Sequence, residues 1–539
     1  MSGPEAVGNP VAGNGGVRVA ELVATLSYAA DLGLGQPLAH CMRQTAIALR
    51  LADLAGASDR EREATYYLGL MINAYCHADA AEQARWFGDD IAFKAAAYDM
   101  FGMNSAQVAA FMVRRLVSHG GALDRARRLT EFPRSGWKEV TDFLVTHARL
   151  VSGFAQQIGL DEVAVESFRQ AYEQWDGKGV PDGRRGEDLT LPARLVQLAG
   201  PVEVYARRYN VDAARAAVRR HRGANFDPAI VDLFCAHASE VLDGLDEASE
   251  WDAILDAEPA LSRWATGAEL DTILEAMADL ADLKSPHFAG HSRGVANLAA
   301  AAAGLWGLSE PEISALRRAG LIHDLGRLGV SNAIWDKHGP LTGPETEHVR
   351  IHPYLTERML AGVTALAASR EIAGRHHERL DGSGYPRGLT GAQLRPPDRL
   401  LAAADAYHAM TEPRPHREPL TPDEAAREIT AEVKAGRLDG GAVDAVLAAA
   451  GRPRPSRRSW PGNLTAREVE VLGLLTRGQS NRQIATRLTI TPKTVANHVE
   501  HIYTKIDVTS RATATLYAMQ NGLVGAYEPP DQESEIGTR

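Results

Sequence analysis

The stretch RHHERLDGSGYPRGLTGAQLRPPDRLLAAA, residues 375–404, has a counterpart in QAYEQWDGKGVPDGRRGEDLTLPARLVQLA, residues 170–199. Both stretches contain Asp-Gly-x-Gly followed by a proline, and both reach an Arg-Leu step at the same distance. Internal similarity of this kind indicates repeated structural units. We therefore expect one unit over residues 18–250 and a second over residues 262–450.

Helical patterning runs almost without interruption from residue 18 to Gly451, and no alternation is long enough to build a sheet. Capping-box patterns begin at Ser309, Thr421 and Thr465, and Ser285 precedes a proline that suits a first helical turn. Aromatic residues make up only 6% of the chain, which also favours helices. The expected fold class is all-α, with tandem helical units.

The chain has 539 residues, a length typical of about three domains, and a net charge of −11, which excludes a generally basic nucleic-acid coat. The three cysteines are widely spaced, as in a reducing compartment. No apolar run reaches the roughly 18 residues that a membrane span needs, and the N-terminus does not resemble a signal peptide. We expect a cytoplasmic protein without membrane attachment.

Three segments have the composition of connections or tails. Residues 1–17 are rich in Gly, Pro and Asn and are expected to be disordered. Residues 451–462 are dense in Pro, Gly and Arg and indicate a linker. An acidic tail covers residues 528–539. The linker separates the second unit from a further domain over residues 463–527.

Ten of the 18 histidines fall between His287 and His416. The pair His323-Asp324 lies in the apolar run GLIHDLGRLG, where a charge is costly without a partner, and a metal ion is a natural partner. A single histidine in a helical domain is more often an ordinary surface or core residue. Several histidines and aspartates in a specific order indicate a metal site instead.

The motifs HDLGR, IHP, HHERLDGSGYPRGL and RLLAAADAYHAM occur in this order, and the region from about 270 to 450 resembles the HD-GYP family of metal-dependent phosphohydrolases. The resemblance implies an all-helical domain that binds two divalent ions, iron or manganese, and hydrolyses cyclic di-GMP. It implies that one ion is held by His291, His323, Asp324 and Asp405. The other is held by His352, His376 and His377, with Asp324 as the bridge.

Hydroxide between two metal ions is a nucleophile near neutral pH, and the ions stabilise the phosphoryl oxygens. The resemblance assigns catalysis to Asp324 and Arg327, and substrate binding to Arg327, Gly384, Tyr385, Pro386, Arg414 and Arg417. Two positions depart from the family: Arg327 stands in place of a lysine, and His416 in place of a tyrosine. His287 could hold a third ion, although an ordinary exposed histidine is the alternative.

The N-terminal unit reads as a degenerate copy. Its counterparts of the HD and HH pairs fall at Ile72-Asn73 and Ala171-Tyr172, and that of the late aspartate at Gly200. Only His40 and His147 persist at ligand positions. Two imidazoles without a carboxylate make a poor two-metal site. We expect no catalysis in this unit, and packing, dimerisation or sensing are its open roles.

Residues 463–527 contain helix starts at Thr465, Ser480 and Thr491, and the turn Thr489–Thr491 joins two of the helices. The segment from Arg452 to Tyr527 contains eleven Lys and Arg residues and four Asp and Glu residues, a net charge of +7. The motifs LTAREVEVL, GQSNRQIA, TPKTVANHV and KIDV resemble the LuxR-type DNA-binding domain, a four-helix module. A packing module that binds no DNA is the alternative interpretation.

In a helix-turn-helix the recognition helix lies in the major groove of double-stranded DNA. Exposed positions on that helix would read bases, and we assign this role to Ala496, Asn497 and Glu500. Contacts to phosphates, which fix register, are assigned to Asn481, Lys493, Thr494, Lys505 and Arg511. Domains of this type usually bind as dimers, so the resemblance also implies a homodimer.

Two functional interpretations remain open from the sequence. In the first, the second unit binds and hydrolyses a cyclic dinucleotide, and the protein is both an enzyme and a transcription regulator. In the second, the unit is a non-catalytic ligand sensor or a dimerisation module of a DNA-binding regulator. The intact metal-ligand positions favour the first interpretation, and the departures at Arg327 and His416 favour the second.

Overall fold

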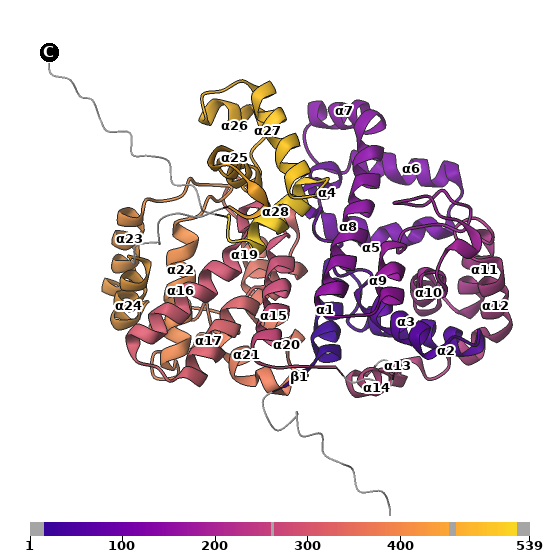
Figure 1. The fold of residues 1–539 in the computed structure, drawn as a ribbon, viewed down its shortest axis with the longest axis horizontal. Helices are drawn as coiled ribbons and strands as arrows, with labels where there is room; N and C mark the ends of the chain where they lie inside the picture. Colours follow the sequence, from indigo (N-terminus) through magenta and orange to yellow (C-terminus); the bar gives the residue numbers. More distant parts are fainter. Residues whose placement is uncertain (1–15, 249, 260–262, 452–459, 525–539) are drawn as a thin grey trace, which may run out of the picture.

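A computed structural model of the chain describes residues 16–248, 250–259, 263–451 and 460–524. These residues form helices almost throughout, which confirms the all-α prediction (Figure 1). The described strands are β1 (Val17–Arg18) and β2 (Trp264–Ala265), which pair antiparallel and join the starts of the two units. The expected acidic tail, and most of the expected disordered N-terminus and linker, lie outside the described residues.

The helices of the two units follow one another in the same order. The first unit comprises α1 (Val19–Gly33), α2 (His40–Leu54), α3 (Asp59–Met71), α8 (Trp137–Gln157), α9 (Glu162–Arg169), η4 (Gly186–Asp188), α10 (Leu191–Arg208), α11 (Val211–Arg220) and α12 (Pro228–Leu242). The connection to the second unit contains α13 (Leu245–Ala248) and α14 (Trp251–Asp256).

The second unit contains the histidine-rich motifs. Its helices are α15 (Gly267–Asp282), η5 (Pro286–Phe288), α16 (His291–Trp306), α17 (Glu310–Ile322), η6 (Leu325–Gly329), α18 (Asn332–Trp335), α19 (Gly343–Arg350), α20 (His352–Met359), η7 (Thr364–Leu366), α21 (Ala367–Ala373), α22 (Pro396–Met410), α23 (Pro422–Lys434) and α24 (Gly440–Ala450). Ser285 caps the short η5 rather than a long helix, since α16 begins only at His291.

The first unit carries an insertion. Asn73 and His147 are 74 residues apart, whereas Asp324 and His352 are 28 apart, an excess of 46 residues. The longer segment forms α4 (Ala80–Phe87), α5 (Asp90–Ala97), η2 (Tyr98–Gly102), α6 (Ser105–Leu116), α7 (Ala122–Glu131) and η3 (Phe132–Gly136). Side chains such as Phe111 and Phe132 give it a small apolar cluster of its own.

The two units share one apolar core, which draws buried residues from both. Polar contacts also cross between them: Asp90 of the insertion accepts a hydrogen bond from Lys284 Nζ at 3.0 Å and from the backbone N–H of Asn332 at 2.9 Å. Burial disfavours the charged forms of Asp90 and Lys284, but the neighbouring lysines lower the pKa of Asp90 to about 2. A buried charge needs such a partner. The units therefore form one body (Figure 1).

The end domain comprises η8 (Pro461–Asn463), α25 (Ala466–Thr476), α26 (Asn481–Arg487), α27 (Pro492–Lys505) and α28 (Arg511–Gln520). The predicted starts are confirmed, because the side chains of Thr465, Ser480 and Thr491 accept hydrogen bonds from the first turns of their helices. These helices pack around a separate apolar core. They form the four-helix arrangement that the sequence predicts.

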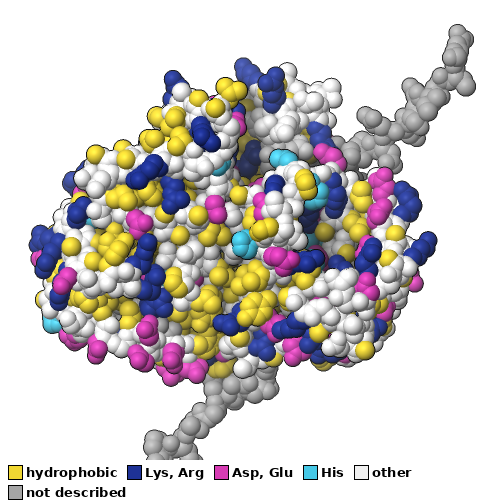
Figure 2. Space-filling view, turned by 180° about the vertical axis from the view of Figure 1, so that it is seen from behind, with side chains coloured by type: hydrophobic (Ala, Val, Ile, Leu, Met, Phe, Trp, Pro, Cys, Tyr) yellow, Lys and Arg dark blue, Asp and Glu magenta, His cyan; other side chains and the backbone are white. Residues whose placement is uncertain are grey.

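Acidic and basic side chains are interspersed over the face opposite to that of Figure 1, with hydrophobic side chains between them (Figure 2). The net negative charge is therefore not gathered into one patch on that face. In the described part of the chain, no helix combines the length and apolar character that crossing a bilayer requires.

Candidate metal centre and DNA-contact surface

The seven predicted metal ligands converge on one buried point. His291 is the first residue of α16, His323 and Asp324 follow α17, His352 begins α20, His376 and His377 follow α21, and Asp405 lies in α22. Six of these side chains are at most 3% exposed, and His377 is half-buried. Loop and helix ends far apart in the sequence thus bring five imidazoles and two carboxylates together.

Glycines in the motifs allow this convergence. A Cβ atom on Gly320 would lie 2.6 Å from the Cα atom of Ala296, so α16 and α17 can approach closely only because Gly320 has no side chain. A Cβ atom on Gly326 would collide with the carbonyl oxygen of His352. The glycine in HDLGR therefore brings the η6 turn against the start of α20, which positions two of the ligands.

Asp324 lies between two groups of imidazoles. Its Oδ2 atom is 3.5 Å from His291 Nε2 and 2.9 Å from His323 Nε2. Its Oδ1 atom is 3.4 Å from His352 Nε2 and 3.6 Å from His376 Nε2. One carboxylate oxygen faces each group, which is the arrangement that a bridging ligand requires.

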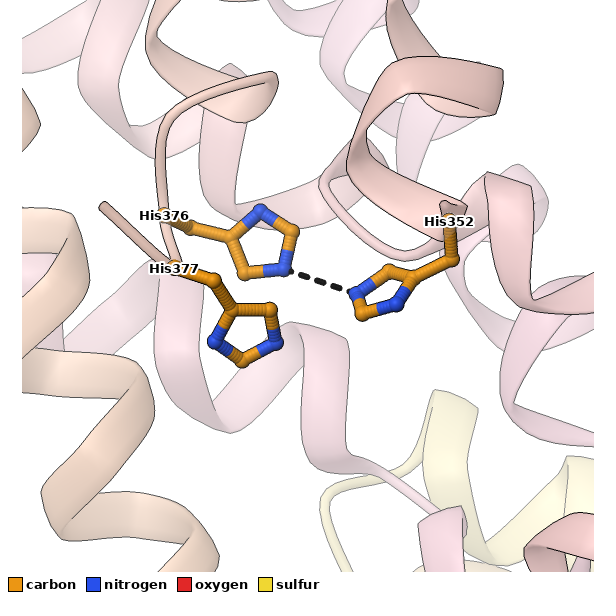
Figure 3. A group of neighbouring side chains, drawn as sticks. All are labelled: His352, His376 and His377. Atoms are coloured by element: carbon orange, nitrogen blue, oxygen red, sulfur yellow. Dashed lines mark hydrogen bonds between the residues drawn. The ribbon is translucent and has the colours of Figure 1, made fainter. Parts of the chain in front are cut away.

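Asp405 completes the cluster from the side of α22. Its Oδ1 atom is 3.2 Å from His291 Nε2, and its Oδ2 atom is 3.7 Å from His377 Nδ1. Figure 3 shows His352, His376 and His377 converging from two segments, with the His352 and His376 rings joined Nε2 to Nε2 at 3.1 Å. These three rings form one candidate ion site, and His291, His323 and Asp324 form another.

The hydrogen bonds of the outward-facing ring nitrogens determine which nitrogen carries the proton. His323 Nδ1 donates to Gly320 O at 2.8 Å, His352 Nδ1 to Val349 O at 2.6 Å, and His376 Nδ1 to Ala373 O at 2.6 Å. A carbonyl oxygen only accepts, so in a neutral ring Nε2 keeps its lone pair and points inward. Metal-binding histidines are usually oriented by bonds of this kind.

The inward-facing nitrogen and oxygen atoms of the ligands offer lone pairs to a cation. The buried atoms His291 Nε2, His323 Nε2 and both carboxylate oxygens of Asp324 lack a hydrogen-bond partner there. When both rings are neutral, the 3.1 Å contact between His352 and His376 places two lone pairs face to face. Unpaired buried acceptors are costly. Divalent ions would satisfy them.

The protonation states suit metal binding as well. Burial alone would raise the pKa of Asp324, but the charges of Arg327 and His323 hold it well below its usual range. Burial lowers the pKa of His352 to about 4 and that of His377 well below its usual range. The Asp324 carboxylate is therefore ionised and the rings of His352 and His377 are neutral, the forms that ligate metal.

Glu412 is a site residue that sequence reasoning missed. Its carboxylate accepts a hydrogen bond from His291 Nδ1 at 2.8 Å, and its other oxygen lies 3.2 Å from His408 Nδ1. Burial would lower the pKa of His291, but Glu412 raises it to about 9. The sequence signal was weak, because Glu412 follows the end of α22 and no local pattern links it to His291.

Two arginines lie at the edge of the centre. Arg327 NH1 is 2.7 Å from Asp324 Oδ2, and its guanidinium lies 4.3 Å from the ring centroid of Phe288 and 5.3 Å from that of Trp335. Arg414 contacts the same Phe288 ring at 5.1 Å and bonds to Glu412 at 3.0 Å. The aromatic rings hold both cations in place, beside the point where a phosphate would meet the metal centre.

The GYP loop follows the two adjacent histidines. The Tyr385 ring lies 4.7 Å from the His377 ring, and Pro386 comes next in the loop. A Cβ atom on Gly384 would collide with the backbone of Glu378, whose carboxylate accepts from the N–H groups of Arg387 and Leu389. Gly384 therefore permits the fold of the loop, and Tyr385 is the member that faces the centre.

The remaining predicted residues lie further out. Arg417 donates to the carbonyl oxygens of Ala409 and Met410, which places it at the end of α22. His287 is half-buried in η5, and burial lowers its pKa. His416 is exposed to solvent. Neither histidine belongs to the groups of side chains that are close enough to share an ion.

The corresponding point of the first unit has other chemistry. His40 Nδ1 bonds to Glu203 at 2.5 Å, but its Nε2 meets the hydroxyl of Tyr98 at 3.2 Å. His147 Nε2 lies 3.4 Å from Asp79. Tyr98 and Asp79 both come from the segment that carries the insertion, so this segment supplies neighbours for the two histidines that the repeat retains.

The DNA-contact surface of the end domain is open on its predicted reading face. Ala496, Asn497, Glu500 and Lys493 are exposed on α27, while Asn481 and Thr494 are half-buried. Lys505 Nζ is paired with Glu468 at 2.7 Å, and Arg511 donates to Gln479 O at 3.0 Å. The base-reading candidates therefore share one exposed helix face, and two phosphate-contact candidates are engaged within the domain.

The end domain rests on the two-unit body through α28, which contacts α15 of the second unit and α8 of the first. Met519 is buried in the shared core of the two units, and Leu516 packs against it. Arg149 bonds to Thr509, and Cβ atoms on Gly290 and Gly478 would touch Val524 and Pro286. The domain thus contacts the segment that leads into His291.

Comparison with known proteins assigns both regions. Residues 275–441 match the model of the HD domain, and residues 462–518 match that of bacterial regulatory proteins of the LuxR family. The chain is 30% identical over 411 residues to a 3′3′-cGAMP-specific phosphodiesterase of Vibrio cholerae, covering 76% of this chain and 89% of that one. A cyclic di-GMP phosphodiesterase of Thermotoga maritima is 34% identical over 168 residues, 31% of this chain and 45% of that one.

Solved structures show the same relationship. A crystal structure of a cyclic GMP-AMP specific phosphodiesterase of V. cholerae superimposes with a TM-score of 0.55 at 25% sequence identity. The superposition covers 81% of this chain and 99% of that chain. Its extent is far greater than one helical unit, so the similarity includes most of the two-unit body.

Proposed function

The chain belongs to the HD-GYP family, and on that premise we propose that it is a metal-dependent phosphodiesterase of a cyclic dinucleotide joined to a DNA-binding transcription regulator. The observation that carries the enzymatic part is the convergence of seven potential ligands with unpartnered inward atoms. The named activities of the relatives support it. An intact set of ligand positions distinguishes the second unit from the first.

Two divalent ions fit the side chains present. His291, His323, Asp324 and Asp405 would hold one ion, and His352, His376 and His377 the other, with iron or manganese suited to imidazole and carboxylate ligands. Such ions supply Lewis acidity toward a phosphodiester and lower the pKa of bound water. His287 belongs to none of the groups of described side chains that are close enough to share an ion, so a third ion is not part of this proposal.

The protein's own cations would orient the substrate. Arg327 and Arg414 are held by Phe288 at the rim of the centre, where guanidinium groups can bond to phosphate oxygens. Tyr385 offers an aromatic face to a base beside His377. We propose 3′3′-cGAMP as the first substrate to test and cyclic di-GMP as the second, because the relative that matches both units is named for the former.

The test combines metal analysis with turnover. Purified protein should contain about two ions per chain and, with manganese or iron, convert a cyclic dinucleotide to a linear product. Metal without product would support the alternative function, a ligand sensor. That alternative rests on the Arg327–Asp324 ion pair of 2.7 Å, which occupies an oxygen that an ion would need. Absence of metal would contradict both functions of the centre.

The regulatory part rests on the LuxR-type match and on the exposed face of α27. We propose that Asn497 pairs with an adenine edge, that Ala496 contacts a thymine methyl, and that Glu500 accepts from a cytosine amine. Lys493, Thr494, Asn481, Lys505 and Arg511 are proposed to meet phosphates. A homodimer in the cytoplasm is the proposed working form, in line with paired half-sites of this class.

Replacing Asn497 tests the DNA assignment. Asn497→Ala should reduce the preference for specific over random DNA by about 1–3 kcal/mol while leaving non-specific affinity almost unchanged. Competition binding with both DNAs measures the two quantities separately. An unchanged preference would overturn the role of Asn497. A parallel loss with both DNAs would show that the variant damages the domain.

A further inference from the structure

A cavity of about 240 Å³ lies in the first unit, at the place where the repeat puts a metal centre in the second. Its lining includes the replaced ligand positions Ile72, Asn73, Ala171, Tyr172 and Gly200. The loss of the metal ligands has therefore left an open space rather than a filled core. No role in the proposed phosphodiesterase activity uses this space.

Hydrogen bonds hold the floor of the cavity. The Tyr172 hydroxyl donates to Ile72 O at 3.1 Å, and the Tyr98 hydroxyl bonds to His40 Nε2 at 3.2 Å. His40 is fixed in turn by Glu203 at 2.5 Å. The retained imidazole is thus occupied on both nitrogens, so it is not available to an ion. These hydrogen bonds make this part of the cavity preformed, as small-molecule sites usually are.

The charge of the lining excludes phosphate. Its residues include no lysine and no arginine, and its one ionisable carboxylate is that of Glu173. An anionic ligand would therefore meet a negative group without a compensating cation. The volume also lies below the roughly 300–1,000 Å³ of pockets for drug-sized ligands. Both observations exclude a whole cyclic dinucleotide and favour a small uncharged ligand.

Glu173 provides an unused acceptor. Its Oε1 atom accepts from the N–H groups of Asp182 and Gly183, at 2.7 and 3.1 Å, while Oε2 is buried without a partner among the described residues. The equivalent Glu378 uses both oxygens, for Arg387 and Leu389. The first unit thus has the same loop contact but leaves one buried carboxylate oxygen without a donor among the described residues.

Amide and aromatic side chains line the same cavity as Glu173. The Asn73 amide has only the thiols of Cys41 and Cys76 as partners, both at 3.8 Å, and the Gln174 amide has none in the described chain. The Phe101 and Phe226 rings stack at 6.0 Å in the wall. Amide edges and aromatic faces are the groups with which proteins recognise bases.

We propose that this cavity binds an uncharged guanine ring, as free base or nucleoside. The base-pairing edge of guanine carries a ring N–H and an adjacent exocyclic N–H. A carboxylate oxygen and the oxygens of neighbouring amides can accept hydrogen bonds from both. Adenine has no ring N–H on that edge. The first unit would then be a binding site for a nucleoside, independent of turnover in the second unit.

Titration calorimetry of the full chain with guanosine tests the proposal. We expect one site per chain, with adenosine and GMP each weaker by about tenfold or more. Leu144→Trp, which adds bulk to the lining, should weaken guanosine binding by about tenfold. Leu305→Trp, at a side chain that is 47% exposed on α16, is the matched control and should bind as the wild type does.

Two further variants make the test independent of any one substitution. Gln174→Ala removes an amide from a half-buried position and should also weaken binding, so the conclusion does not depend on the fold of Leu144→Trp. Asp324→Ala should leave guanosine binding unchanged, which separates this site from the metal centre. The proposal is overturned if guanosine does not bind, if GMP binds as tightly, if both lining variants bind normally, or if Asp324→Ala abolishes binding.

Discussion

The first and second units place histidines at matching positions and surround them differently. His147 precedes the Ala171 position by 24 residues, as His352 precedes His376. Both side chains are buried, which alone would lower the pKa of each. Asp79 nevertheless raises the pKa of His147 to about 10, whereas His352 falls to about 4 among other imidazoles. The neighbours, rather than the histidine itself, decide whether a position serves an ion pair or a metal.

The second matching pair makes a similar contact in both units. His40 and His291 each bond through Nδ1 to a buried carboxylate, at 2.5 and 2.8 Å. These carboxylates occupy different places, since Glu203 lies within α10 and Glu412 follows the end of α22. A contact that orients the ring is therefore present in both units, although a different carboxylate supplies it in each.

The largest effect is expected from Asp324→Ala. Removing the carboxylate that lies between the two imidazole groups should strip the metal and abolish turnover, while DNA binding by the end domain persists. Metal analysis and a hydrolysis assay measure both. The matched change Asn73→Asp restores a carboxylate at the equivalent position of the first unit, and we expect no second metal centre, because Tyr98 occupies His40. Normal turnover by Asp324→Ala would refute the ligand assignment.

Glu412→Gln should have the next largest effect. The amide keeps the shape but weakens the bond that orients His291, and loss of such a partner typically costs 10–100-fold in metal affinity. Competition with a chelator measures the affinity directly, apart from activity. Glu428, exposed on α23, is a matched control for substitution by glutamine. Unchanged metal affinity would mean that Glu412 does not position the ligand.

Glu203→Gln should instead affect stability alone. Glu203 is fully buried and accepts from Arg43 and Arg207 as well as from His40, so neutralising it weakens three bonds at once. Breaking a buried ion pair in this way costs about 3–5 kcal/mol. Denaturant unfolding measures the loss, and metal content per folded chain should stay at the wild-type value. A fall in metal content without loss of stability would contradict the division of roles between the units.

The smallest effect is a pH dependence that belongs to the first unit. Because the folded pKa of His147 is raised to about 10, its pairing with Asp79 contributes stability that is fully present below the unfolded value of about 6.5. That contribution is lost as pH rises through about 10. The free energy of unfolding of His147→Gln should lie below that of the wild type at pH 7, and this difference should disappear at pH 10.5. If the difference between the two proteins is the same at both pH values, the pairing of His147 with Asp79 does not contribute to stability.

Much of this comparison could be predicted from sequence. The repeat, the HD and HH pairs and the end-domain helices are local patterns. The structure confirms the helices, and it brings the side chains of the HD and HH pairs close together. Glu412, Tyr98 and Asp79 could not be found in this way. Each acts through a contact with a residue far away in the chain, and the segment that supplies Tyr98 and Asp79 has no counterpart in the second unit. The periodicity of apolar residues predicts helices, but it does not predict which residues from elsewhere in the chain pack against them.

Helix α28 belongs to two packing arrangements at once. Ala514 and Ala518 lie in the core of the end domain, and Met519 in that of the two-unit body. A module tied only by a flexible tether samples many directions, whereas this shared helix holds α27 at one angle to the rest of the molecule. The orientation of the reading face is then set by the folded body. Lengthening or shortening residues 452–459 would leave that angle as it is.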